Sequence, residues 1–180
     1  EEAPFRLAAP GKARRSWVDK DTIFLGADLG RDGDMTSSGY PRRVREWKRG
    51  TDPTKAPIVF EGEDGDVSVG AYVSRSRGHA FEWRYRTTSF YTSKRWLRRY
   101  NCDEKWRALD ELGFPDDASV SHTGGWLPID PRSPIEVGGK TYAAGSYLAV
   151  DYDDVVTNGL KGATCRALFE PTPTTSARCS

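Results

Sequence analysis

A serine hydrolase needs a nucleophilic serine at a tight turn and a histidine that accepts its proton. The turn has the pattern G-x-S-x-G, because only small residues fit around a serine held between a strand and a helix. The nearest match is Asp66-Val67-Ser68-Val69-Gly70, which begins with Asp and follows an alternating strand pattern. Of the 2 histidines, His79 lies in an Arg- and Gly-rich turn and is interpreted as a surface residue. We predict that this chain contains no catalytic residue.

The other histidine begins the sequence His122-Thr123-Gly124-Gly125. Loops with His-Gly-Gly motifs supply oxyanion-hole donors in esterases. Since no nucleophile elbow follows in the chain, we interpret this segment as the turn before a strand that starts at Trp126.

Acidic residues gather in two places that could suggest a cation site. Asp28, Asp32 and Asp34 share one loop, but a calcium loop starting at Asp32 would need Gly at its sixth position and Glu at its twelfth. Ser37 and Arg43 stand there instead, so a solvated acidic loop is the better interpretation. The second group, Asp151, Asp153 and Asp154, resembles a turn after a strand. We predict no metal site and no cofactor.

Three cysteines, Cys102, Cys165 and Cys179, lack the C-x-x-C spacing of a zinc site or redox motif. Their odd number argues against a disulfide framework. We interpret them as free thiols in a reducing compartment and, since no basic-then-apolar leader precedes Phe5, expect a cytoplasmic protein.

Residues 81–100 contain 7 aromatic and 6 basic residues, a combination that single-stranded nucleic-acid binders use for stacking and charge. Phe81, Trp83 and Tyr85 alternate, however, and a strand would place them together on one buried face. Acidic runs nearby also neutralise the field. We therefore favour buried strands and predict no nucleic-acid partner.

The amino-acid composition indicates which kind of secondary structure must position these candidate residues. The 180 residues carry a net charge of +1 and include 18 Gly, 11 Pro, 6 Trp, 8 Tyr and 7 Phe. Aromatic residues and turn formers favour strands and tight connections. No apolar run approaches the roughly 20 residues of a membrane span, so no membrane partner is expected.

Alternation and turn residues predict many short strands. We expect strands at residues 22–25, 42–49, 58–60, 67–74, 81–86, 89–100, 126–129, 147–150 and 166–170. Residues 29–41 and 137–145 read as loops. The one predicted helix spans Asp103–Leu112, where Trp106, Leu109 and Leu112 repeat every third residue before Gly113 and Pro115.

A weak internal repeat helps to choose among all-β folds. Ile58–Gly62 and Ala167–Pro171 share an apolar-Phe-Glu pattern at the end of a strand group. The distance between them leaves room for about two units of the roughly 40–50 residues that propeller blades occupy. We predict an all-β partial propeller of about three to four antiparallel blades, with little helix.

Several segments together resemble the N-terminal β-propeller of bacterial prolyl oligopeptidase-type (S9 family) serine peptidases. The most specific is Ser38-Gly39-Tyr40-Pro41-Arg42 followed by Trp47-Lys48-Arg49-Gly50-Thr51. The others are Ser16-Trp17-Val18-Asp19-Lys20-Asp21-Thr22, Tyr142-Ala143-Ala144-Gly145-Ser146 and Leu168-Phe169-Glu170-Pro171-Thr172-Pro173.

The resemblance implies a seven-bladed propeller joined to an α/β-hydrolase domain that carries the Ser-Asp-His triad. Residues 1–180 would form part of that propeller, without the catalytic domain. The segment would restrict access to short peptides, and the hydrolase domain would be its partner. Trp17, Trp47, Trp83 and Trp126 would pack mainly between blades. A free-standing interaction module and, less favoured, a single-stranded nucleic-acid-binding domain remain as alternatives.

Overall fold

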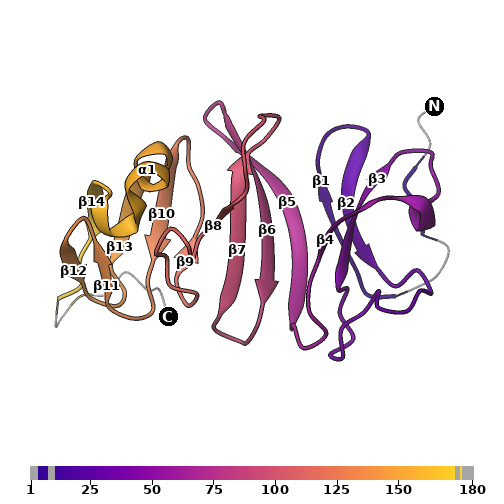
Figure 1. Ribbon diagram of the computed structural model, residues 1–180, viewed down its shortest axis with the longest axis horizontal. Helices are drawn as coiled ribbons and strands as arrows, with labels where there is room; N and C mark the ends of the chain where they lie inside the picture. The colour runs from indigo at the N-terminus through magenta and orange to yellow at the C-terminus, as the bar shows by residue number, and fades with distance from the viewer. Residues whose placement is uncertain (1–3, 8–10, 173–174, 176–180) are drawn as a thin grey trace. The chain divides into compact units, whose positions relative to one another are not determined.

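The computed structural model describes residues 4–7, 11–172 and 175 (Figure 1). These residues fall into two units. The first consists of the described residues within Glu1–Val73 and Glu82–Ser93, and the second of those within Ser74–Phe81 and Lys94–Ser180.

The first sheet lies wholly in the first unit. It has four antiparallel strands in chain order: β1 (Ala13–Trp17), β2 (Thr22–Ala27), β3 (Arg43–Lys48) and β4 (Ile58–Glu61). Every residue of the apolar strand β2 is buried. Ile23 pairs with Trp47 across the sheet, and both belong to a core cluster that Phe5 covers. A short 3-10 helix, η1 (Pro53–Lys55), connects β3 to β4.

The second sheet contributes to both units. Its order is β5 (Ser68–Ser76), β6 (His79–Thr87), β7 (Ser93–Arg99) and β8 (Arg107–Ala108). The predicted burial of one face of β6 is confirmed for two of its three rings, because Phe81 and Trp83 are only 0% and 1% exposed. Tyr85, the third, is partly buried.

The third sheet lies in the second unit. Its spatial order is β14 (Cys165–Phe169), β13 (Tyr147–Asp151), β10 (Trp126–Asp130) and β9 (Ser119–Val120). A hairpin of β11 (Ile135–Val137) and β12 (Lys140–Tyr142) separates β10 from β13 in the chain. Residues 137–145, expected to be a loop, therefore contain a strand, since Gly138 and Gly139 adopt the positive φ angles that a tight hairpin turn requires.

The internal repeat corresponds to equivalent strands. Ile58–Gly62 contains β4, and Ala167–Pro171 contains the end of β14; each of these strands lies at an edge of its four-stranded sheet. The described residues thus form three four-stranded antiparallel sheets and one two-stranded hairpin, with a single α-helix, α1 (Tyr152–Gly162). This confirms an all-β fold of blade-like sheets with little helix.

The predicted helix at Asp103–Leu112 is wrong. Arg107 and Ala108 instead pair with Leu97 and Trp96 as strand β8, and Leu109 N donates to Arg95 O over 2.9 Å. A helix of about ten residues is marginal by itself, so the sheet edge and the tertiary contacts decide the conformation.

The helix that does form was expected to be a turn. Asp151 caps α1 by accepting from the backbone N–H groups of Asp153 and Asp154, and those two acidic residues favour the positive end of the helix dipole. Val155 and Leu160 bury its inner side. The signal was present as an acidic N-cap, but Gly159 and Gly162 within ten residues make the helix pattern weak.

The tryptophans differ in burial. Trp47 and Trp83 are buried, and Trp83 stacks on Tyr72 with ring centroids 6.1 Å apart. Trp126 is partly buried beneath the Arg166 guanidinium, 4.1 Å from its ring centroid. Trp17 departs from the expected packing, since it is 57% exposed and meets Phe5 at its edge.

No helix in the described ranges has the length and apolar character that a membrane span requires.

Candidate functional site

Ser68 lies where a sheet places it rather than where a nucleophile would need it. It is buried at the first position of β5, and the strand continues past Gly70 to Ser76. An elbow serine has to project from a turn between a strand and a helix. This local geometry does not fit a nucleophilic serine.

His122 packs within the second unit. Its ring lies 4.9 Å from the ring of Phe81, between centroids. Thr123 and Trp126 exchange two backbone hydrogen bonds of 2.9 and 3.1 Å, which confirms the turn predicted before the Trp126 strand. His79 is exposed at the start of β6, as expected of a surface residue.

The environment of His122 predicts a pH effect on stability. Burial lowers the pKa of its imidazole, and the nearby His79 lowers it further. As pH falls below about 6.5, the histidine of the unfolded chain takes up a proton more readily than His122 of the folded chain, so the unfolded state is favoured. We expect the urea midpoint to fall between pH 7 and pH 5.5, and the fall to be smaller in His122→Gln.

The matched control for that measurement is His79→Gln, which removes the exposed histidine and should retain most of the pH dependence. An unchanged pH dependence in His122→Gln would contradict the role assigned to burial.

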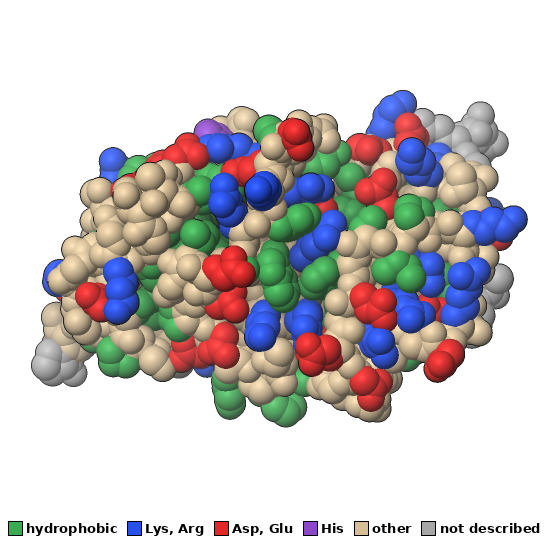
Figure 2. Space-filling model, in the orientation of Figure 1, with side chains coloured by type: hydrophobic (Ala, Val, Ile, Leu, Met, Phe, Trp, Pro, Cys, Tyr) green, Lys and Arg blue, Asp and Glu red, His purple; other side chains and the backbone are tan. Residues whose placement is uncertain are grey.

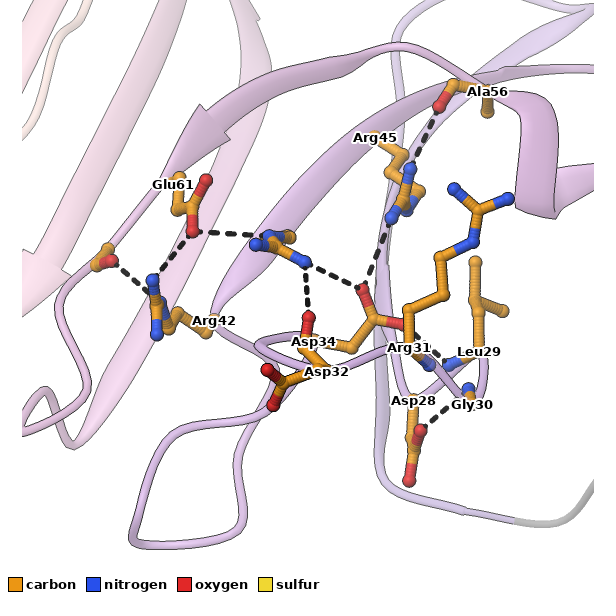
Figure 3. A network of polar contacts seen from close by, with 12 residues as sticks. Asp28, Leu29, Gly30, Arg31, Asp32, Asp34, Arg42, Arg45, Ala56 and Glu61 are labelled. Carbon is orange, nitrogen blue, oxygen red and sulfur yellow. Dashed lines mark hydrogen bonds and ion pairs between the residues drawn. The ribbon is translucent and has the colours of Figure 1, made fainter.

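The loop at residues 29–41 is organised around the carboxylate of Asp34 (Figure 3). Asp34 is 1% exposed, and its Oδ1 accepts from Arg45 Nη2 at 3.2 Å and lies 3.8 Å from Arg43 Nη1. Its Oδ2 accepts from the backbone N–H groups of Leu29 and Arg31 at 3.1 and 3.3 Å. Arg45, 4% exposed, also donates to Ala56 O. A buried ion pair with this many donors holds the loop in one conformation.

This arrangement corrects the description of the three aspartates as one solvated acidic loop. Asp32 is exposed, and Asp28 accepts from Gly30 N in a local turn, whereas Asp34 is internal and neutralised by arginine. Among the residues with described positions, no three His, Cys, Asp or Glu side chains are grouped so as to hold a metal ion.

The Ser38–Arg42 motif ties this loop to the end of the sheet. Thr36 N donates to Tyr40 O and Gly39 N donates to Thr36 O, both over 2.8 Å, which closes a turn in which Gly39 has φ +71°. Arg42 then reaches Glu61 Oε1 at 2.7 Å and Gly62 O at 3.1 Å (Figure 3). The motif therefore has a structural task, which is to fasten β3 to β4.

The Trp47–Thr51 motif stabilises the opposite end of β3, where the strand finishes. Trp47 Nε1 donates to Thr51 O at 2.8 Å, and Gly50 supplies the positive φ of the turn. Arg49 contacts Asp21 through an ion pair of 3.3 Å and Lys20 through a carbonyl hydrogen bond of 2.7 Å. Two of the segments that carry the family resemblance are thus bonded to each other, and both stabilise the same sheet.

A cleft of about 490 Å³ lies in the first unit between the first sheet and β5. Its lining includes Arg14, Arg15 and Ser16 of β1, Gly70 of β5 and Tyr85 of β6. Ser16 Oγ donates to Ala71 O at 2.6 Å and connects β1 to β5. The sequence offered one signal for this site, the Arg14–Arg15 pair, but nothing that would place Tyr85 beside it.

Several groups of the segment considered for nucleic-acid binding are used internally, whereas Phe90 and Tyr91 are exposed. Phe81 and Trp83 are buried, and Arg86 forms ion pairs of 2.7 Å with Asp66 and with Glu63. Figure 2 shows acidic and basic side chains interspersed on the face in view. Two of the 7 aromatic rings in residues 81–100 are therefore inaccessible to bases, which favours the interpretation as packed strands.

A polar cluster in the second unit was not anticipated. Glu104 accepts from Tyr152 Oη at 2.9 Å and from Arg99 N at 2.7 Å, while Arg99 Nη2 pairs with Asp153 at 2.6 Å. Burial raises the pKa of Tyr152, and the hydrogen bond with Glu104 raises it further. The cluster fixes the start of α1 and presents no nucleophile.

Cys102 is exposed and Cys165 is partly buried, and both are free thiols. Burial raises the pKa of Cys165, and its hydrogen bond with Tyr142 raises the pKa of that phenol to about 12. Cys165 is therefore a protonated thiol at neutral pH, without the thiolate that reactivity requires. Cys179 lies outside the described residues.

Four-stranded antiparallel sheets of this kind are the blades from which β-propellers are built. No family model matches the sequence. The chain is 27% identical over 163 residues to an uncharacterized peptidase of Rickettsia prowazekii, covering 87% of this chain and 22% of that protein. It is 31% identical over 86 residues to an uncharacterized peptidase of Sinorhizobium fredii, covering 47% of this chain and 12% of that protein.

Among solved structures, a post-proline cleaving enzyme from Rickettsia typhi shares the fold with a TM-score of 0.74 and 24% identity. The match covers 89% of this chain and 23% of that chain. The resemblance to a prolyl oligopeptidase-type propeller is thereby confirmed at the level of the fold. The chain spans less than a quarter of the length of these relatives.

Proposed function

We propose that this chain is the substrate-gating propeller portion of a prolyl oligopeptidase-like serine peptidase that acts on short peptides in the cytoplasm. The catalytic serine, histidine and aspartate would belong to an α/β-hydrolase domain outside residues 1–180. The observation that carries the proposal is the fold match to a post-proline cleaving enzyme over 89% of the chain.

The local geometry supports a passive role for this segment. Ser68 is buried in a strand, and the motif residues Arg42 and Arg49 are committed to ion pairs within one sheet. Such contacts would keep the sheet rigid. A rigid propeller would select substrates by size, because a folded protein cannot pass through an opening that admits an extended peptide. Bond cleavage would require the nucleophile and oxyanion donors of the partner domain.

The experiment uses the intact protein and a series of proline-containing peptides that share one cleavage sequence and differ in length. We expect cleavage after proline, at a rate that falls steeply between short peptides and chains of several tens of residues. The matched control replaces the proline of each peptide with glycine and should be cleaved at least tenfold more slowly, which corresponds to about 1.4 kcal/mol in transition-state binding.

Two outcomes would contradict the proposal. Equal rates for short peptides and folded proteins would exclude gating. Absence of hydrolysis, together with failure of a serine-directed phosphonate to label the intact protein, would favour a free-standing interaction module, because propellers serve many functions.

A further inference from the structure

The cleft beside β1 contains an unusual excess of hydrogen-bond donors. Arg14 lines it with its side chain, whereas Arg15, the next residue of β1, pairs with Leu25 and directs its side chain to the opposite face of the sheet; neither Asp nor Glu lines the cleft. In the part of the chain that the structure describes, neither guanidinium has an ion pair with a carboxylate. This differs from the arginines of β3 in the same sheet, since Arg43 pairs with Glu61 at 3.1 Å and Arg45 with Asp34 at 3.2 Å.

Tyr85 adds a further donor. Arg14 Nη1 donates to Tyr85 Oη over 3.4 Å, so the phenol oxygen acts as an acceptor in that contact. Within the described residues, its own hydroxyl hydrogen meets no acceptor and remains available to a ligand. A guanidinium that is hydrogen-bonded to a phenol oxygen makes the phenol a better donor, because hydrogen bonds in a chain polarise one another.

Gly70 is what allows Tyr85 to lie in the cleft. A Cβ at position 70 would come within 2.5 Å of Tyr85 Oη and 2.6 Å of the ring carbon that bears it. Gly70 has no positive φ, so the glycine is required by this close approach and not by the backbone conformation. The phenol therefore rests against the backbone of β5 at a defined position, beside Arg14.

We propose that this cleft binds the terminal carboxylate of a short peptide, through the guanidinium of Arg14 and the hydroxyl of Tyr85. A carboxylate has two oxygens in a plane and only accepts hydrogen bonds, which matches a fork-shaped guanidinium and an O–H donor. The choice of a peptide as the bearer of the carboxylate rests on the function proposed above. Binding here would orient a peptide by its C-terminus before it is cleaved.

The test measures fluorescence anisotropy of a labelled, proline-free Gly-Ala tetrapeptide on the intact protein, as the free acid and as the C-terminal amide. We expect the acid to bind about tenfold more tightly at low salt, as charge-assisted hydrogen bonds predict. Arg14→Gln and Tyr85→Phe should each remove most of this preference, and Arg14→Lys should retain part of it. Tyr85→Phe preserves the ring over Gly70, and thermal melting checks that each variant is folded.

The matched control is Arg31→Gln, which removes an exposed arginine of the same unit that does not line the cleft. It should leave the preference for the acid unchanged. Equal affinity for acid and amide, or an equal loss in Arg31→Gln and Arg14→Gln, would overturn the inference. Stronger displacement by inorganic phosphate than by acetate would also overturn it, since the site would then be a phosphate site.

This outcome is separable from the proposed function. Proline-specific hydrolysis without a preference for the free carboxylate would overturn the inference alone. A carboxylate preference that depends on Arg14 in a protein without peptidase activity would overturn the proposed function alone.

Discussion

Replacing Asp34 with alanine is expected to lower the free energy of unfolding by about 3–5 kcal/mol, the usual cost of breaking a buried ion pair by removing one partner. Arg45 would keep its charge at 4% exposure with Ala56 O as its remaining acceptor in this network. The backbone N–H groups of Leu29 and Arg31 would lose their acceptor as well. Urea denaturation of the intact protein measures the loss.

Asp32→Ala is the matched control, because Asp32 is exposed in the same loop and the change removes the same charge. It should alter the free energy of unfolding by no more than about 0.5 kcal/mol. In the double variant Asp34→Ala/Arg45→Met, no uncompensated charge is buried, and the loss should be smaller than the sum of the two single losses. A loss below about 1 kcal/mol in Asp34→Ala would show that the loop does not depend on this pair.

Replacing Phe81 with alanine is expected to cost about 3–5 kcal/mol, as full truncation of a buried aromatic side chain does. Phe81 is 0% exposed, and its ring meets that of Tyr152 edge-on, with centroids 4.8 Å apart and an interplanar angle of 69°. The substitution removes this contact and the contact with His122, and leaves a cavity beneath the start of α1. Thermal and urea unfolding of the intact protein would both report it.

Phe90→Ala makes the same chemical change at a site that is 90% exposed, between β6 and β7. We expect its effect to be within about 0.5 kcal/mol of zero. Phe81→Leu keeps most of the volume and should cost less than Phe81→Ala, at about 1–1.5 kcal/mol. Equal losses in Phe81→Ala and Phe90→Ala would contradict the burial on which the prediction depends.

Most strands were predictable from local pattern. In β2 Thr22, Ile23 and Phe24 are β-branched or aromatic, and in β6 Phe81 and Trp83 alternate with polar residues, so neighbouring side chains already indicate an extended backbone with a buried face. The recurrence that links β4 to β14 was also visible in the sequence, and each of these strands lies at an edge of a four-stranded sheet.

The errors occurred where local signals were weak. Residues 103–112 carry a three-residue apolar repeat, yet hydrogen bonds from β7 to Arg107 and Ala108 make that region a sheet edge. Residues 152–162 contain two glycines, and Gly159 (φ +66°) kinks the helix, but burial of Val155 and Leu160 stabilises the helical turns on either side. In both segments local propensity amounts to a few tenths of a kcal/mol per residue, and tertiary packing outweighs it.

The sequence by itself determined the fold class, most of the strands, the family resemblance and the poor fit of Ser68 to a nucleophile elbow. Only the tertiary structure decided which charges are internal. In one acidic loop it buries Asp34 and leaves Asp32 exposed. It places Arg14 beside Tyr85, whereas Arg43 pairs with Glu61 and Arg45 pairs with Asp34. The reason is that the type of a residue shows only whether its side chain can carry a charge. The burial and the partners of that charge depend on strands that are distant in the chain and adjacent in space.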